Sequence, residues 1–201
     1  MADTANLSIF EVRLPQTNEH TFESMSALLS NFTQFSNLSF FERLIGKKKT
    51  IVSLEIVLRE GQIHFYIAAL SDNSEFLHSQ ILAQYSTAIL RETKDYLLDL
   101  DPQSPINFTQ LGLARSYDYP IKTAKDFKET DPLTSVLAPL SRSNNIKDFF
   151  LFQILLSGAL KNWQNNIIST IQNGILVDKE RNLRTAHPDK AIFEQKIQFP
   201  G

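Results

Sequence analysis

The chain has 201 residues, a length that suits one large domain or two domains of roughly 100 residues. Hydrophobic residues make up 42% and charged residues 21%, which excludes wholesale disorder, a collagen-like repeat and a coiled-coil rod. Twenty Lys and Arg stand against 22 Asp and Glu, a formal charge of -2. Any binding to nucleic acid or to an anionic membrane therefore depends on local surface charge rather than on net charge.

The chain contains no Cys, which excludes disulfides, thiolate zinc sites and a Cys nucleophile, and agrees with a reducing compartment. Its longest apolar stretch, residues 149–156, is far shorter than the roughly 20 residues of a membrane-spanning helix. Residues 1–12 show neither the basic region nor the long apolar core of a secretory signal. We therefore expect a cytoplasmic protein without a membrane span.

Three segments of the first half alternate between polar and apolar residues. Residues 7–14 and 50–59 both show the period of two that is typical of a half-buried strand. The alternation resumes over residues 61–69, directly after Glu60-Gly61, where glycine allows a positive φ. This pattern predicts a β-hairpin joined by a tight turn.

Helical spacing separates these predicted strands. Apolar residues recur every third or fourth position in residues 21–32 and again in residues 75–85, which predicts two amphipathic helices. Residues 87–93 then predict a short strand. The resulting order, β-α-β-β-α-β, predicts an α+β fold in which a ferredoxin-like antiparallel sheet carries its helices on one face. We assign this unit to residues 1–98.

A linker with two prolines, residues 99–105, separates this unit from a second α+β unit over residues 106–201. Within the second unit, residues 106–122 predict a long, bent strand because Gly112 interrupts their apolar pattern. A helix is expected after Asp131-Pro132, where Asp caps and Pro occupies the first helical position.

The rest of the second unit predicts two further elements. Residues 149–156 are apolar on both alternating sets, which is typical of a central strand covered on both faces. The spacing of apolar residues over 163–175 predicts a helix that stops at Asn173-Gly174, after which residues 191–199 are the remaining periodic segment for a further strand of the sheet. The second unit thus resembles the first in element order but is incomplete. Burial in a core is favoured over an interface for four large aromatic residues, namely Phe149, Phe150, Phe152 and Trp163.

The chain shows no motif of known catalytic chemistry. The segment ending in Gly46-Lys47 has Phe41 where a phosphate-binding loop requires glycine and Lys48 where it requires Ser or Thr. The four His do not pair with one another or with a carboxylate at helical metal-ligand spacing, and no nucleophile elbow is present. We expect no catalytic residue, no cofactor and no metal.

Five residues are candidates for contacts with nucleic acid or with a protein partner. Lys47, Lys48 and Lys49 form a basic run, for which a solvated loop is the favoured interpretation. His64 and Tyr66 are predicted on the sheet face away from the helices, where RNA-recognition modules stack bases. Residues 61–67 do not match the pattern of a basic residue, glycine and spaced aromatic residues that such modules have on this strand, so packing or solvent exposure is the favoured interpretation.

Several segments resemble the N-terminal region of conjugative, type IV secretion-like ATPases of the HerA-related group. The matching segments are residues 51–56, 61–67 and 80–85, Asp131-Pro132-Leu133 with Leu137, residues 153–155, Trp163, and Glu194 with Lys196 before Pro200-Gly201. Ser86 departs from the pattern, since a proline is expected there. These matches lie at turns and core positions, and they extend over most of the chain.

The resemblance implies an accessory module that lies N-terminal to an ATPase core and carries no ATP-binding residue itself. We therefore expect a non-catalytic assembly module of a DNA- or protein-translocating ATPase, acting through protein-protein contacts, cytoplasmic and free or peripheral to the inner membrane. The alternative is a nucleic-acid-binding module that uses the open sheet face. A third and weaker hypothesis is a small-molecule enzyme, which requires a pocket with convergent polar groups.

Overall fold

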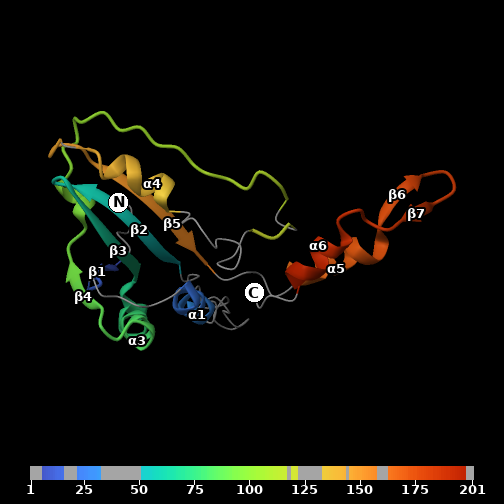
Figure 1. Cartoon of the computed structure of the whole chain (residues 1–201), viewed down its shortest axis with the longest axis horizontal. Helices are drawn as coiled ribbons and strands as arrows, with labels where there is room; N and C mark the ends of the chain where they lie inside the picture. Colours follow the sequence, from blue (N-terminus) through green and yellow to red (C-terminus); the bar gives the residue numbers. More distant parts are fainter. Residues whose placement is uncertain are drawn as a thin grey trace. The chain divides into compact units, whose positions relative to one another are not determined.

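The computed structural model describes residues 6–15, 22–32, 51–116, 119–121, 133–143, 145–157 and 163–197 (Figure 1). The chain divides into two compact units, each built from two stretches of sequence. Unit 1 comprises Met1–Ser104 and Ala124–Gly158, and unit 2 comprises Pro105–Thr123 and Ala159–Gly201.

Unit 1 is built on a five-stranded sheet in the order β4-β1-β3-β2-β5. The strands are β1 (Leu7–Arg13), β2 (Val52–Arg59), β3 (Gln62–Leu70), β4 (Ile89–Thr93) and β5 (Phe150–Leu156). Every pair of neighbours is antiparallel. The fold class predicted from the sequence, α+β with an antiparallel sheet, is therefore confirmed.

The β2-β3 hairpin has the turn that its sequence predicts. Glu60 and Gly61 both have positive φ, at 52° and 73°, and the pair Arg59 and Gln62 closes the ladder. Positive φ at both central residues matches the right-handed twist of the two strands. The turn thereby fixes which side chains of β3 face the helices, because a shift of one residue would exchange the two faces.

One face of the sheet is covered by helices α1 (Phe22–Phe32) and α3 (Ser74–Gln84), which lie side by side in Figure 1. Their fully buried residues are Leu28, Leu77 and Ile81. These pack with strand residues of alternating positions into one core, whose strand members are Phe10, Val52, Ile67 and Ala69. The apolar residues of α1 and α3 therefore lie on one side of each helix and pack against the sheet, as their spacing in the sequence predicts.

A third helix, α4 (Thr134–Leu140), packs farther along β2. Its Leu140 forms a buried cluster with Ile56 and Leu58 of β2. Those two residues follow Val52 and Leu54 at intervals of two, so α4 covers the same face as α1 and α3. The predicted helix after Asp131-Pro132 is thus present, although those two residues lie outside the described ones.

Unit 2 contains a two-stranded antiparallel sheet and two helices among its described residues. The elements are α5 (Trp163–Asn173), β6 (Ile175–Asp178), β7 (Leu183–Thr185) and α6 (Lys190–Ile197). Gly174 separates α5 from β6 with φ at 59°, as the helix stop at Asn173-Gly174 predicts. Ile167 of α5 and Phe193 of α6 are buried.

The structure differs from the sequence-based predictions in the second half of the chain. The long strand predicted over residues 106–122 is wrong, because residues 106–116 and 119–121 carry no regular secondary structure. Residues 191–199 were expected as a periodic segment for the sheet, but α6 occupies Lys190–Ile197. In a helix the adjacent residues Ile192 and Phe193 lie on one turn, about 100° apart around the axis, whereas in a strand they would point to opposite faces.

The division of the chain also differs from the predicted one. The boundary within residues 99–105 agrees with the end of the first stretch of unit 1 at Ser104. However, β5 lies in unit 1, whereas the sequence placed residues 106–201 in one second unit. Among the described residues β5 is an edge strand with partly exposed side chains, not a central strand covered on both faces. Apolar residues on both alternating sets therefore do not identify a central strand here.

Gly174→Ala tests the backbone constraint at the start of β6. A Cβ at this position would overlap the carbonyl oxygen of Thr185, and φ is positive, so we expect the free energy of unfolding of unit 2 to fall by about 2 kcal/mol. Urea denaturation followed by the fluorescence of Trp163, the one Trp of the chain, measures this change. Gly112→Ala is the matched control, because no atom lies within 4 Å of its added Cβ. Equal stability of the two variants would contradict the prediction.

Candidate functional site

The sheet face opposite the helices carries a row of polar side chains. One row of directly paired residues crosses all the strands from β4 to β5: Arg91, Glu11, Tyr66, Glu55 and Gln153. Paired residues point to the same face of a sheet, so their side chains are neighbours. We call this set the polar row.

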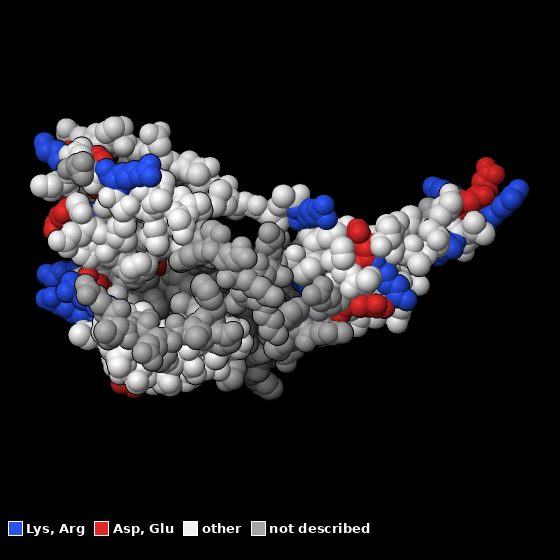
Figure 2. All heavy atoms as spheres, viewed as in Figure 1, with Lys and Arg blue, Asp and Glu red and all other residues white. Residues whose placement is uncertain are grey.

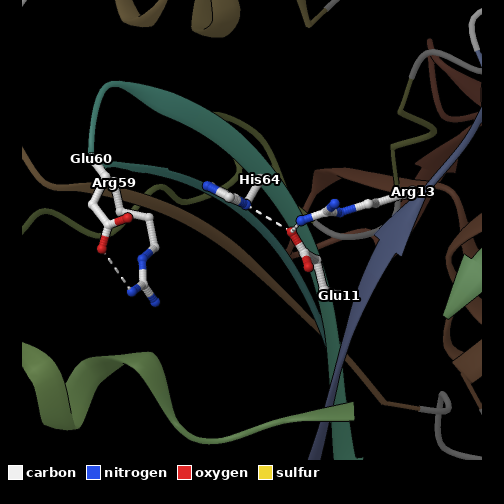
Figure 3. Close-up of polar contacts among 5 residues, drawn as sticks. All are labelled: Glu11, Arg13, Arg59, Glu60 and His64. Carbon is white, nitrogen blue, oxygen red and sulfur yellow. Dashed lines mark hydrogen bonds and ion pairs between the residues drawn. The ribbon is translucent and has the colours of Figure 1, made fainter. Parts of the chain in front are cut away.

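Glu11 is the charged centre of one half of the polar row (Figure 3). Its Oε1 accepts hydrogen bonds from Arg13 Nη2 at 2.9 Å and from His64 Nδ1 at 2.8 Å. Burial raises the pKa of Glu11, but the hydrogen bonds from His64 and Arg13 outweigh burial and hold the pKa below its ordinary value. Glu11 is therefore ionised at neutral pH and can only accept hydrogen bonds.

This state of Glu11 determines the tautomer of His64. Because the carboxylate accepts, Nδ1 of His64 must carry the hydrogen, and the neutral ring then has a bare Nε2. Figure 3 shows the second ring nitrogen on the side away from Glu11. The arrangement is a carboxylate-histidine pair whose outer nitrogen is available to a ligand.

Glu55 is the buried centre of the other half of the polar row, with 7% of its surface exposed. Its carboxylate accepts from Ser53 Oγ at 2.6 Å, Tyr96 Oη at 2.6 Å and Gln153 Nε2 at 3.0 Å. These donors come from β2 itself, from the 3₁₀ helix η3 (Tyr96–Asp99) and from β5. Burial, followed by the hydrogen bond to Glu55, raises the pKa of Tyr96. Glu55 thus joins three segments of unit 1.

Tyr66 lies between the two carboxylates and is itself covered. Its ring stacks on Tyr96 at a centroid distance of 4.7 Å and on His64 at 5.9 Å, and only 5% of the residue is exposed. Burial, followed by the charge of Glu11, raises the pKa of its hydroxyl. A base cannot stack on a ring that Tyr96 already covers, so Tyr66 does not offer the aromatic platform of RNA-recognition modules.

The half of this face near β1 and β4 is open, and forms a shallow depression of about 400 Å³. Its basic side chains are those of Arg13, Arg59, Arg91 and Lys94. Its acidic side chains are those of Glu11, Glu60 and Glu92, and His64, Tyr66 and Thr93 complete the lining. Figure 2 shows basic side chains interleaved with acidic ones at the margin of unit 1.

The charges of the depression are not equally engaged. Arg13 pairs with Glu11, and Arg59 pairs with Glu60 at 3.2 Å and with Asp99 at 3.6 Å. Arg91 and Lys94 make no ion pair with any residue that the structure describes. The charged groups of the depression that make no ion pair with a described residue are therefore Arg91, Lys94 and the acidic Glu92, all on β4 or directly after it.

The residues predicted from the sequence fall into two groups. His64 and Tyr66 lie on the sheet face away from the helices, but Tyr66 is buried and His64 is hydrogen-bonded to Glu11. Lys47, Lys48 and Lys49 lie outside the described residues. Three residues that define the site, Glu11, Arg91 and Glu55, were not predicted as site residues, because only the strand register brings them together.

Two other features are absent from the part of the chain that the structure describes. No group of three or more His, Asp or Glu side chains there is placed to hold a metal ion. None of its helices combines the length and the apolar character that crossing a bilayer requires. The depression is accordingly the site whose chemistry we consider below.

Tyr96→Phe tests the role of the hydrogen bonds to Glu55. The change removes one donor from a buried carboxylate and leaves the ring stacking in place, so we expect a loss of about 1–3 kcal/mol in the free energy of unfolding. Ser53→Ala removes a second donor and should act in the same direction. Ser79→Ala is the control, because Ser79 bonds a backbone carbonyl at an exposed position and should change stability little. Urea denaturation followed by circular dichroism measures all three variants.

Glu11→Gln tests the charge state of the other carboxylate. A lowered pKa in the folded state adds stability that is complete above the ordinary value of 4.5 and is lost as the pH falls through the folded value. The wild-type chain should therefore exceed the variant in unfolding free energy at about pH 5, and the difference should shrink toward pH 3. A difference that is constant from pH 5 to pH 3 would contradict the prediction.

Comparison with known protein families finds a match over most of the chain. The model of a domain of unknown function, DUF8128, matches residues 2–196. No curated protein and no solved structure matches the chain. The matched residues include both stretches of unit 1 that build the five-stranded sheet, and most of unit 2. The chain therefore belongs to the DUF8128 family.

Proposed function

We propose that the chain is a non-catalytic assembly module of a type IV secretion-like or conjugative translocating ATPase. It acts through protein-protein contacts in the cytoplasm, free or peripheral to the inner membrane. Two lines support this proposal. The first is the resemblance of residues 51–56, 61–67 and 80–85 to the N-terminal region of HerA-related ATPases. The second is the surface of unit 2.

The observation that carries the proposal is a segment of unit 2 with exposed apolar side chains. Residues 106–113 have no regular secondary structure, yet they include Ile106, Phe108, Leu111 and Leu113, all of them exposed. Phe108 has 93% of its surface accessible to solvent. Contiguous apolar residues on a surface are typical of sites that contact another protein. We call residues 106–113 the apolar segment.

The energetic argument favours a protein partner for the apolar segment. Each large apolar side chain that leaves water on binding contributes on the order of 2 kcal/mol. An unpaired backbone also has free N–H and C=O groups that can bond with the edge of a partner's sheet. Duplex nucleic acid offers little apolar surface to such a segment, whereas a groove of a protein partner can offer both kinds of contact.

The alternative function is nucleic-acid binding, and the basic residues of the depression favour it. Arg91 and Lys94 are exposed and can contact phosphates. Stacking on Tyr66 is not available to this alternative, since Tyr96 covers the ring. Binding would then be electrostatic, and its affinity would fall steeply with salt. Binding to a protein partner with an affinity that does not depend on salt would support the proposed function and not this alternative.

The double variant Phe108→Ser with Leu111→Ser tests the proposed function. The ligand is the purified ATPase core of a HerA-related translocase encoded in the same genome, and binding is measured by interferometry at two salt concentrations. We expect the wild-type chain to bind with little salt dependence and the double variant to bind at least about tenfold more weakly.

The control changes a polar residue of the same segment. Gln110→Ser should bind the ATPase core as the wild-type chain does. Failure of the wild-type chain to bind, or equal binding by the double variant and the control, would contradict the proposed function. Steep, salt-dependent binding to single-stranded DNA, together with no binding to the ATPase core, would establish the alternative in its place.

A further inference from the structure

The depression on the sheet face brings together two basic side chains and a ring nitrogen that no described residue engages. Arg91 and Lys94 make no ion pair with a described residue, and Nε2 of His64 points away from the one carboxylate that the ring bonds. These groups come from β4, from the residue after β4 and from β3. All three line the same open volume of about 400 Å³.

The acidic residues of the depression do not cancel this charge. Glu11 is held by Arg13 and His64, and Glu60 lies against Arg59. Glu92 also lines the depression, beside Arg91 on β4. The four basic side chains of the lining still outnumber its three acidic ones, so the depression keeps a net positive charge.

His64 is held in place by Glu11, which leaves its second ring nitrogen for a ligand. Its Nδ1–H is fixed by Glu11, and its side chain is only 17% exposed. The bare Nε2 of this tautomer accepts a hydrogen bond from a protonated oxygen of the ligand.

We propose that the depression binds a phosphate-class oxyanion through Arg91, Lys94 and Nε2 of His64. Arg91 contributes a planar guanidinium that can bond two oxygens, and Lys94 contributes a compact charge. A phosphate group has enough oxygens for Arg91, Lys94 and His64 together, and its protonated oxygen can donate to the bare Nε2 of His64. A carboxylate offers two oxygens and no hydrogen, so it satisfies fewer of these groups. The source is inorganic phosphate or the terminal phosphate of a nucleotide.

This proposal is independent of the assembly role. It involves unit 1, whereas the apolar segment lies in unit 2. Loss of the ATPase-core contact in the Phe108 and Leu111 double variant would leave phosphate binding unchanged. Equally, loss of phosphate binding in variants of the depression would leave the ATPase-core contact unchanged.

Thermal unfolding of the full chain provides the first test, with sodium phosphate, ADP and sodium chloride compared at equal ionic strength. A ligand that binds only the folded state stabilises that state, so Tm rises with the concentration of the ligand. We expect phosphate or ADP to raise Tm above the chloride value. No difference between chloride and both phosphate ligands would overturn the proposal.

Variants of the depression provide the second test, with dissociation constants measured by calorimetry. Arg91→Gln and Lys94→Gln each remove one charged donor, and we expect each to weaken binding at least about tenfold. Arg142→Gln and Lys147→Gln are the matched controls, because these residues are exposed and do not line the depression. Equal affinities in the site variants and the controls would overturn the proposal.

His64→Asn separates the binding role of the ring from its structural role. The amide of Asn can still donate to Glu11 in the place of Nδ1, but it has no group in the place of Nε2. We expect weaker phosphate binding with little change in the free energy of unfolding. Unchanged phosphate affinity in a folded His64→Asn variant would remove His64 from the site and overturn the proposal as stated.

Three ligands distinguish the source of the phosphate group. Equal affinity for inorganic phosphate and ADP supports the free anion, and tighter binding of ADP that is lost in the Arg91 and Lys94 variants supports a nucleotide. A single-stranded oligonucleotide that binds with a steep salt dependence, while phosphate and ADP do not bind, would overturn the proposal in favour of a nucleic-acid surface.

Discussion

The buried carboxylate of Glu55 sets the constraint on which the helix-free face depends. A carboxyl group with 7% exposure is tolerated in a sheet only if hydrogen bonds replace those it would make to water, and here three neutral donors supply them. Those donors tie η3 and β5 to β2, although Gln153 lies 98 residues beyond Glu55 in the chain. Tyr96, held by this bond, in turn covers Tyr66. One carboxylate therefore determines which half of the face is closed.

The two acidic residues of the polar row, Glu11 and Glu55, differ in their hydrogen-bond donors and in their exposure to solvent. Glu55 receives only neutral donors under a cover of aromatic rings, whereas Glu11 receives charged and ionisable donors beside open solvent. The first arrangement stabilises the fold, because the bonds are withdrawn from exchange with water. The second keeps a histidine oriented while its outer nitrogen stays available. The same row of residues thus joins a structural half to a half suited to binding.

Local patterns in the sequence were sufficient for the first half of the fold. The period of two around Glu60-Gly61 identified the hairpin, and the spacing of Leu77 and Ile81 identified α3, because each pattern reflects contacts made within one element. The partner of β2 was not predictable, since β5 joins it across about a hundred residues and no local signal reports that pairing. The site followed the same rule: His64 could be placed on its face from alternation, but its meeting with Glu11 required the register of β1 against β3.

The return of the chain to unit 1 after residue 123 affects the order in which that unit can form. Strands β1 to β4 are complete by Thr93, and their contacts can be made as soon as that length has been synthesised. The outer edge of β2 gains its partner only when Phe150–Leu156 has emerged from the ribosome. Until then its N–H and C=O groups are open to other strands, and closing so long a loop is slow. Nascent chains are consequently most exposed to mispairing between these two points of synthesis.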